Sequence, residues 1–359
     1  SIDALLGTSW MREYYRYMTN STINDLGGTD ITGFQNEDGK ISAGDSNAAL
    51  LSFFARVNYD YDNKYLLSLS IRRDESSKFH KDNRVGYFPS VSAGWNVHQE
   101  KWFQNPVMSK LKIRASYGEL GANFLNPYNF DAIAYGPIPY TVGGERYVTG
   151  RAAYLKSKDL KWETAKTTDI GIELGFFNND LTLSLDYFVK KNVDLLAQID
   201  LNLSSGQIFE INSSREKPYV NTASVKNTGW EFMMNYRKQL TKDFHIDATF
   251  NIATLKNKVL SLGENVQPIT SGAMSSYFND AASITMPGEA IGSFYGYKID
   301  GFDAEGNFIF ADTDKNGVVN ANDKVILGSP IPDFTYGLNI NMEYKDFDLT
   351  VFFQGVQGN

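Results

Sequence analysis

A short stretch near the carboxyl end carries the side chains best suited to bind a metal ion. It runs from residue 312 to residue 323 and has the sequence Asp-Thr-Asp-Lys-Asn-Gly-Val-Val-Asn-Ala-Asn-Asp. Oxygen-bearing side chains at its first, third and fifth positions, a glycine at its sixth and an acid at its twelfth follow the spacing of a calcium-binding EF-hand loop. Because Ca²⁺ prefers six or more oxygen ligands, the stretch predicts a bound Ca²⁺ with a structural role.

The spacing assigns a role to each predicted ligand. The side chains at the first, third and fifth positions would ligate the ion directly, and the residue at the seventh position would supply its backbone carbonyl. The side chain at the ninth position would ligate the ion directly or through a water molecule, and the acid at the twelfth position would close the site. In chain order these residues are Asp312, Asp314, Asn316, Val318, Asn320 and Asp323. Asp323 is shorter than the usual glutamate and no helical pattern flanks the loop, so the stretch is closer to the isolated calcium loops of dockerin-type repeats. The alternative is a turn rich in aspartate and asparagine that holds no ion.

Other residue types offer little for catalysis. The chain has no cysteine, which excludes disulfides, thiolate metal sites and a cysteine nucleophile. Its three histidines, His80, His98 and His245, are far apart and show no metalloprotease spacing, and no Gly-x-Ser-x-Gly elbow is present. A net charge of −8 argues against nucleic acid as a partner. The sequence therefore indicates a protein that is not an enzyme and has no organic cofactor.

The elements that would position the loop are β-strands. Between residues 52 and 74 apolar side chains occupy every second position, with a turn at 62–64. Alternation with a period of two indicates an antiparallel pair that has one apolar face. Each arm has about ten residues or more, which exceeds the average soluble strand and matches the length that a tilted strand needs to cross a bilayer. The same pattern recurs along the chain, and we count about eleven such strands.

The connections between these strands alternate between short and long. The short ones are 62–64, 178–180, 238–243 and 345–346, and the long ones include 18–48, 120–160 and 256–331. Segment 256–331 is predicted to contain no membrane crossing, with Phe294, Tyr295, Tyr297 and Ile299 in a strand of the loop. Transmembrane barrels have short turns on one side and long loops on the other. The predicted fold is therefore an all-β transmembrane antiparallel β-barrel with long extracellular loops.

Eight short motifs recur through the chain, at residues 54–59, 62–67, 73–79, 87–95, 113–118, 227–231, 293–297 and 332–337. These motifs resemble the SusC/RagA family, the TonB-dependent outer-membrane transporters of Bacteroidetes. Together they span nearly the whole chain in the order that the family shows. Glu75 departs from the glycine that the family often has in its Arg-Asp-Gly-Ser-Ser run, which is a change in a surface loop.

The resemblance implies a 22-stranded barrel, of which residues 1–359 form a portion of the C-terminal β-barrel domain. The plug domain, the TonB box and the last strands would be absent from this chain. The implied function is TonB-dependent active import of a bulky nutrient, an oligosaccharide or a peptide, across the outer membrane of a bacterium. The implied partners are a SusD-like lipoprotein over the outer mouth, TonB through the missing N-terminal part, and the lipid of the outer membrane.

Two alternatives stay open at this stage: a soluble glycan-binding β-sandwich, and a porin or adhesin without a plug. Aromatic residues crowd two of the long loops, where they would suit sugars, peptides, loop packing or a partner equally. These residues are Tyr128, Phe130, Tyr135, Tyr140 and Tyr147 in one loop and Tyr277, Phe278, Phe294, Tyr295 and Tyr297 in the other. The sequence therefore assigns no substrate-binding residue.

Overall fold

One large antiparallel sheet dominates the computed structural model, which describes residues 1–21, 40–126, 134–152, 157–198, 219–263, 266–275 and 278–359. The sheet has 12 strands, and its neighbours follow the order β1-β2-β3-β4-β5-β8-β9-β10-β11-β19-β20, with β12 paired to β10 off this path. Their bounds are β1 (Ile2–Ser21), β2 (Lys40–Tyr61), β3 (Tyr65–Ser76), β4 (Val85–Asn96), β5 (Met108–Ala122), β8 (Glu163–Phe176), β9 (Leu181–Gln198), β10 (Tyr219–Thr241), β11 (Phe244–Thr254), β12 (Lys256–Ser261), β19 (Phe334–Tyr344) and β20 (Phe347–Gln357). Eleven strands on the path confirm the number expected from the alternation.

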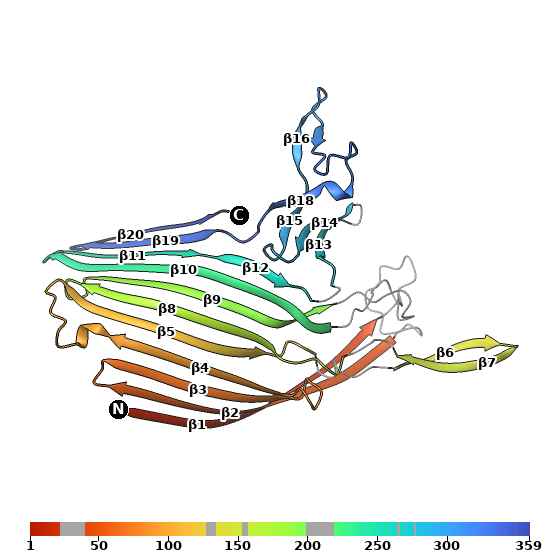
Figure 1. Cartoon of the computed structure of the whole chain (residues 1–359), viewed down its shortest axis with the longest axis horizontal. Helices are drawn as coiled ribbons and strands as arrows, with labels where there is room; N and C mark the ends of the chain where they lie inside the picture. The colour runs from red at the N-terminus through yellow and green to blue at the C-terminus, as the bar shows by residue number, and fades with distance from the viewer. Residues whose placement is uncertain (22–39, 127–133, 153–156, 199–218, 264–265, 276–277) are drawn as a thin grey trace.

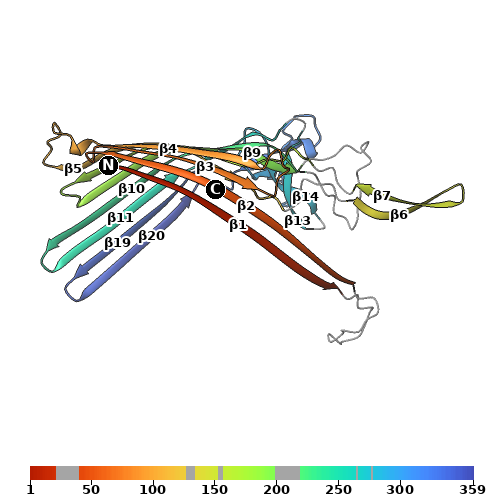
Figure 2. The ribbon, with the colours of Figure 1, turned by 90° about the horizontal axis from the view of Figure 1, so that it is seen from below.

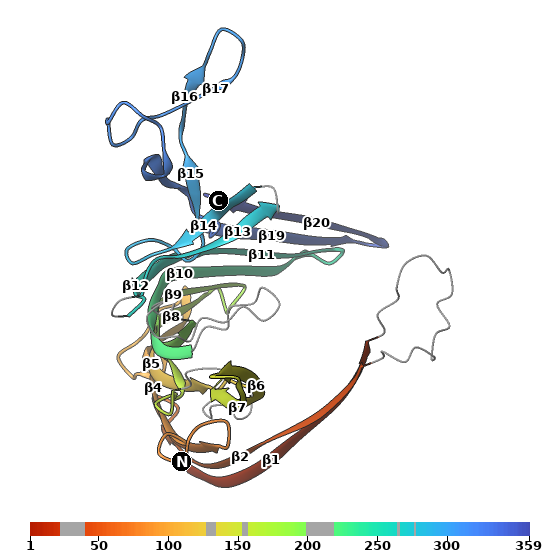
Figure 3. The same ribbon diagram turned by 90° about the vertical axis from the view of Figure 1, so that its right-hand side faces the viewer.

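The sheet curves around a hollow, so that it has a convex and a concave face (Figures 2 and 3). Each strand pairs with its neighbour in an antiparallel register, for example Val57 opposite Leu69 and Ala55 opposite Ile71. The right-handed twist of β-strands and the tilt that accompanies it bend a long sheet in this way. Among the described residues, no helix is both long and apolar enough to cross a bilayer.

The apolar rows that the sequence assigns to one face are exposed. Phe53 and Val57 on β2 and Leu69 and Ile71 on β3 are 48, 42, 46 and 50% exposed. In the part of the chain that the structure describes, no second sheet covers these rows, and a β-sandwich would bury them between two sheets. The alternative of a soluble β-sandwich is therefore wrong.

The connections lie at two ends of the sheet, as the alternation predicts. Short turns join β2 to β3, β8 to β9, β10 to β11 and β19 to β20 at one end, and the long segments lie at the other (Figure 1). One expected loop is shorter than predicted: β1 continues to Ser21 and β2 begins at Lys40, so both strands extend into the expected connection 18–48. Where a strand extends past the apolar band, water meets both of its faces. The backbone pairing continues there, but the side chains no longer alternate between apolar and polar, so the sequence shows no period of two.

The expected loop 120–160 also contains structure that the sequence did not predict. A hairpin of β6 (Ala134–Val142) and β7 (Glu145–Ala152) occupies its middle. Two adjacent glycines with positive φ, Gly143 and Gly144, form its turn.

After β12, which pairs with β10, the segment that leads to β19 folds outside the large sheet. β13 (Ile269–Ser275), β14 (Phe278–Thr285), β15 (Ser293–Tyr297) and β18 (Lys324–Gly328) form a four-stranded sheet, and β16 (Ile299–Phe302) pairs with β17 (Phe308–Phe310). Because β11 pairs directly with β19, the segment adds no crossing, which confirms that prediction. Phe294, Tyr295 and Tyr297 lie in β15, and Ile299 begins β16.

Buried apolar side chains gather in two small clusters around the long loops. The first contains Phe79, Phe88, Leu125, Leu160 and Trp162. The second contains Ala197, Ala223, Val225, Val259 and Leu262. These clusters anchor the loop end of the sheet, and the large apolar face does not contribute to them.

Candidate functional site

The predicted calcium loop connects β17 to β18 and brings three of its acids together. Asp312, Asp314 and Asp323 each place one carboxylate oxygen so that the three atoms lie within 4.8 Å of one another. Among the described residues, this is the only group of three or more acids, histidines or cysteines with that spacing. A compact set of carboxylate oxygens fits a hard divalent cation such as Ca²⁺.

The start of the loop is a tight turn around the Asp312 carboxylate. Asp312 Oδ1 accepts a hydrogen bond from the backbone N–H of Asn316 at 3.1 Å, and its Oδ2 accepts one from Gly317 at 2.7 Å. Gly317 has a φ of 86°, a conformation that glycine adopts without steric cost. The glycine at the sixth position therefore has the turning role that the motif requires.

The Asp323 carboxylate closes the loop from its other end. It is fully buried, and it accepts hydrogen bonds from the backbone N–H groups of Asn320 at 2.8 Å, Thr313 at 2.7 Å and Asp314 at 3.2 Å. The Asn320 bond is the first of the causes that lower the pKa of Asp323. Asp323 also completes a reciprocal cap with Asn320 on the short 3₁₀ turn Ala321–Asp323. The carboxylate is thus charged at neutral pH and joins both ends of the loop.

The other three predicted ligands are engaged in hydrogen bonds within the loop. The Asn316 side chain donates to Asp314 Oδ2 at 2.8 Å and accepts from the Val318 N–H at 2.9 Å. The Val318 carbonyl accepts from the Asn320 side chain at 3.1 Å. The structure therefore brings together the three acids and holds Asn316, Val318 and Asn320 beside them in a hydrogen-bonded turn.

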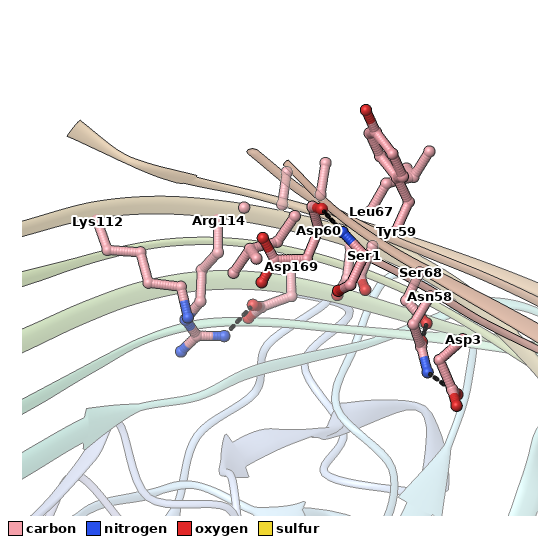
Figure 4. Close-up of a pocket in the computed structure, with 16 residues that line it drawn as sticks. Ser1, Asp3, Asn58, Tyr59, Asp60, Leu67, Ser68, Lys112, Arg114 and Asp169 are labelled. Atoms are coloured by element: carbon pink, nitrogen blue, oxygen red, sulfur yellow. Dashed lines mark hydrogen bonds and ion pairs between the residues drawn. The ribbon is translucent and has the colours of Figure 1, made fainter. Parts of the chain in front are cut away.

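A second polar site lies on the concave face of the large sheet. A hollow of about 550 Å³ is lined by side chains of β1 to β5 and β8, including Asp3, Asn58, Arg114 and Asp169. Figure 4 shows these four side chains on one side of the ribbon, with Tyr59 and Leu67 on the other. The concave face is therefore polar and charged where the convex face is apolar.

One arginine holds the charges of this wall together. Arg114 on β5 forms ion pairs with Asp169 at 3.1 Å, Glu173 at 3.4 Å and Asp186 at 2.6 Å. Glu173 also pairs with Lys110 at 2.7 Å. Asp186 is only 8% exposed and lies over Gly171, where any larger side chain would collide with it. The network links three adjacent strands through their inward side chains.

The sequence did not single out this network. Its residues occupy the polar positions of strands whose opposite positions are apolar, so their shared direction follows from the alternation. Their mutual contact does not, because it depends on the register of β5 with β8 and of β8 with β9.

The aromatic loop residues divide between described and undescribed parts of the chain. Tyr128, Phe130 and Tyr277 lie outside the described residues. Tyr135 and Tyr140 lie in β6, Tyr147 in β7 and Phe278 in β14.

A curved antiparallel sheet of long strands, apolar on its convex face and charged on its concave face, is the wall of an outer-membrane β-barrel. A sequence profile described as "TonB dependent receptor-like, beta-barrel" matches residues 2–358, and the chain belongs to that family. The family comprises receptors of the bacterial outer membrane and not enzymes.

Relatives and solved structures agree with this assignment. The chain is 36% identical over 327 residues to TonB-dependent receptor P3 of Formosa agariphila, covering 86% of this chain and 32% of the relative. It is 33% identical over 324 residues to TonB-dependent receptor SusC of Bacteroides thetaiotaomicron, covering 84% of this chain and 30% of SusC. The structure of the RagAB peptide importer in its open-open state superposes with a TM-score of 0.78 at 23% identity, covering all of this chain and 38% of that one. The chain thus spans about a third of the length of these proteins.

Proposed function

We propose that this chain forms a portion of the C-terminal β-barrel domain of a TonB-dependent importer. The observation that carries the proposal is the eleven-strand path with an exposed apolar outer face, found in a chain of the TonB-dependent receptor family. The plug domain, the TonB box and the last strands would lie in other parts of the importer. Eleven strands are half of the 22 that the SusC/RagA resemblance implies.

The cargo that we propose is a bulky nutrient, either an oligosaccharide or a peptide. The relationship to SusC supports a SusD-like lipoprotein as the partner over the outer mouth. RagAB, which has the same fold in this region, is described as a peptide importer. The charged concave wall supports a water-filled or protein-filled interior, since these side chains would be unstable against lipid.

Uptake by cells that carry the full-length protein tests this function. We expect cells to accumulate labelled oligosaccharides or labelled oligopeptides, and deletion of TonB to abolish the accumulation. Competition between the two classes of label identifies the cargo. Uptake that continues without TonB would contradict active import and favour a porin without a plug.

We also propose that the Asp312–Asp323 loop binds a structural Ca²⁺. The support is the convergence of three carboxylates and the turn at Gly317, in a loop whose spacing matches that of known calcium loops. The ion would neutralise the repulsion between the acids and stiffen the loop. The experiment is calcium titration calorimetry on the full-length protein in detergent.

The calorimetry has a matched control. We expect Ca²⁺ heat from the wild type and from Asp300→Asn, an exposed acid outside the loop, and none from the double variant Asp312→Asn/Asp314→Asn. No heat from the wild type would show that the loop is a hydrogen-bonded turn alone.

A further inference from the structure

Four lysines form a row across the large sheet near the end that carries the long loops. Lys166 on β8 lies opposite Lys191 on β9 in the strand register. Lys191 lies opposite Lys226 on β10, and Lys226 lies opposite Lys258 on β12. These four strands are consecutive neighbours in the sheet (Figure 1). We name these four residues the lysine row.

The lysine row lies on the convex face. Along β9, Asp186 faces the hollow as part of the arginine network, so Lys191, an odd number of positions further on, lies on the opposite face. On β10, Val225 is buried in the second apolar cluster, so its neighbour Lys226 points to the other side. Further strands of a barrel would extend the sheet beyond its edges, β1 and β20, and would leave this face open.

Three of the four lysines lack an acid that would neutralise them. Lys166 pairs with Glu119 on β5 at 3.2 Å. Within the part of the chain that the structure describes, Lys191, Lys226 and Lys258 form no ion pair. Like charges directly opposite each other on neighbouring strands destabilise a sheet. A bound anion would therefore stabilise this part of the wall.

The lysine row lies just beyond an aromatic pair on the same face. Tyr187 on β9 and Trp230 on β10 lie opposite each other, with ring centroids 4.8 Å apart. Lys191 and Lys226 follow four positions nearer the loops on these strands, which is about 13 Å along a strand. Because tyrosine and tryptophan gather at the level of lipid head groups, we place the lysines at the polar surface of the bilayer. Long loops mark the extracellular side of such barrels, so this surface belongs to the outer leaflet.

A side pocket of about 690 Å³ adjoins the row. Its lining includes Trp230, Lys256 and Lys258. Glu289 and Asp333 also line it, and among the described residues neither forms an ion pair with these lysines. Lys256 and Lys258 are exposed. The pocket thus places an aromatic ring beside two ammonium groups, an arrangement that suits a lipid whose phosphate meets the lysines while its acyl chains follow the apolar face.

The position of the row disfavours other anions. Cargo that moves through the hollow would not meet it, because the lysines lie on the other face of the sheet. An acidic protein would have to displace lipid from the wall to reach them. Lipid phosphates already surround the wall at this level, so they need no further recruitment.

We propose that the lysine row and the side pocket bind the phosphate groups of a lipid in the outer leaflet. The ammonium groups of Lys191, Lys226 and Lys258 would hold the phosphates as point charges. The bound lipid would remove the repulsion between the three lysines. The inference goes beyond the proposed function, since it depends on the membrane wall alone and on neither the cargo nor the lipoprotein.

The test measures lipid binding to the full-length protein in detergent by native mass spectrometry. The probes are diphosphorylated lipid A and the same lipid with both phosphates removed. We expect the wild type to bind the phosphorylated form at least about tenfold more tightly, because each lysine near an anionic lipid surface contributes about fivefold in affinity. This preference should shrink as salt is raised. Equal affinities of the wild type for the two lipids would overturn the proposal.

A triple variant removes the unneutralised charges. In Lys191→Gln/Lys226→Gln/Lys258→Gln the preference for the phosphorylated lipid should fall to within about twofold, while binding of the dephosphorylated lipid stays unchanged. The second lipid shows that the variant is folded and still binds acyl chains. A triple variant that keeps the wild-type preference would overturn the lysine row as the site.

The matched control removes the same charge elsewhere. Lys101→Gln/Lys190→Gln/Lys242→Gln changes three exposed lysines, of which Lys190 is the neighbour of Lys191 on the hollow side. The other two lie at the turn end of the sheet. This variant should keep the wild-type preference. A loss equal to that of the first triple variant would show an effect of net charge and would contradict a defined site.

Two further measurements identify the source of the phosphate. Inorganic phosphate at the concentration of the lipid should not displace lipid A, and displacement would show a site for the free anion. A photo-crosslinking residue at position 228, between Lys226 and Trp230 on the same face, should capture lipid in cells. Capture of an acidic protein there instead would overturn the proposal.

This inference and the proposed function fail separately. A wild type that prefers the phosphorylated lipid but shows no TonB-dependent uptake overturns the import function alone. A wild type that takes up its cargo but binds the two lipids equally overturns the lipid site alone.

Discussion

Asp323 shows how much one buried carboxylate can organise. Its oxygens accept hydrogen bonds from the backbone N–H groups of Thr313, Asp314 and Asn320, which lie at both ends of the loop. These bonds favour the charged form and lower the pKa of Asp323 below its ordinary value. Since protonation weakens the acceptor oxygens that these three donors share, the order of the loop is linked to pH.

This linkage predicts a loop that loosens in acid. A depressed folded-state pKa contributes stability above the unfolded pKa of about 4 and loses it as the pH falls through the lower folded value. We expect the Thr313 and Asn320 amides to be protected from hydrogen exchange at pH 5–7, the loss of protection occurring only below about pH 4. In Asp323→Asn the Asn320 amide should exchange faster at all these values, and an unchanged pH profile in that variant would contradict the account.

Arg114 has the corresponding role on the concave wall. Replacing it by methionine would leave Asp169, Glu173 and Asp186 without their shared cation. Because the Arg114 side chain is 37% exposed, solvent weakens the effect, and we expect a loss of about 1–3 kcal/mol in the free energy of unfolding of the full-length protein in lipid vesicles.

The matched control is Arg56→Met on the same face of β2. Arg56 is exposed, so this change should alter the free energy of unfolding by less than about 0.5 kcal/mol. Equal losses in the free energy of unfolding for the two variants would show that the ion pairs of Arg114 contribute no more to stability than an exposed arginine does.

At the scale of the strand, alternation is the property that matters. In β3 Leu69 faces outward from the sheet and Ser70 faces the hollow, where its hydroxyl lies 2.6 Å from that of Ser90. Adjacent residues of one strand therefore face different solvents.

Two arginine substitutions test this division. Leu69→Arg should lower the free energy of unfolding in lipid vesicles by about 2–4 kcal/mol, because an arginine near the middle of the bilayer is poorly solvated. Ser70→Arg should lower this free energy less, since that side of the strand faces the hollow and not lipid. If Ser70→Arg proves less stable than Leu69→Arg, the assignment of the two faces is reversed.

At the scale of the whole chain, the exposed apolar face determines whether the protein is stable in water or in lipid. Rows of phenylalanine, leucine, isoleucine and valine on the convex face have no cover within the described residues. Water would disfavour them by about 25 cal/mol for each Å² exposed, whereas lipid would not.

The full-length protein should therefore stay in the membrane fraction after washing with alkaline carbonate and be released only by detergent. A peripheral protein held by charges would leave the membrane in the wash, because such contacts are screened or titrated. Recovery in detergent-free buffer would contradict an integral barrel.

The local pattern was sufficient to predict the wall strands and the absence of a crossing between β11 and β19. Each outward side chain meets lipid individually, so its type is constrained position by position, and the period of two is visible without the fold. The strand ends around Ser21, Lys40 and Ala122 and the β6–β7 hairpin were missed, because beyond the membrane both faces meet water and the constraint on residue type disappears.

The sequence by itself determined the alternating wall, the turns and the spacing of the acids at residues 312–323, because these depend on neighbours a few residues apart. Only the tertiary structure decided that Arg114 meets three carboxylates from two other strands and that β16 pairs with β17 apart from the large sheet. Both depend on strand register and on how a long connection leaves the sheet. Those properties arise from pairing between distant parts of the chain, and no local period encodes them.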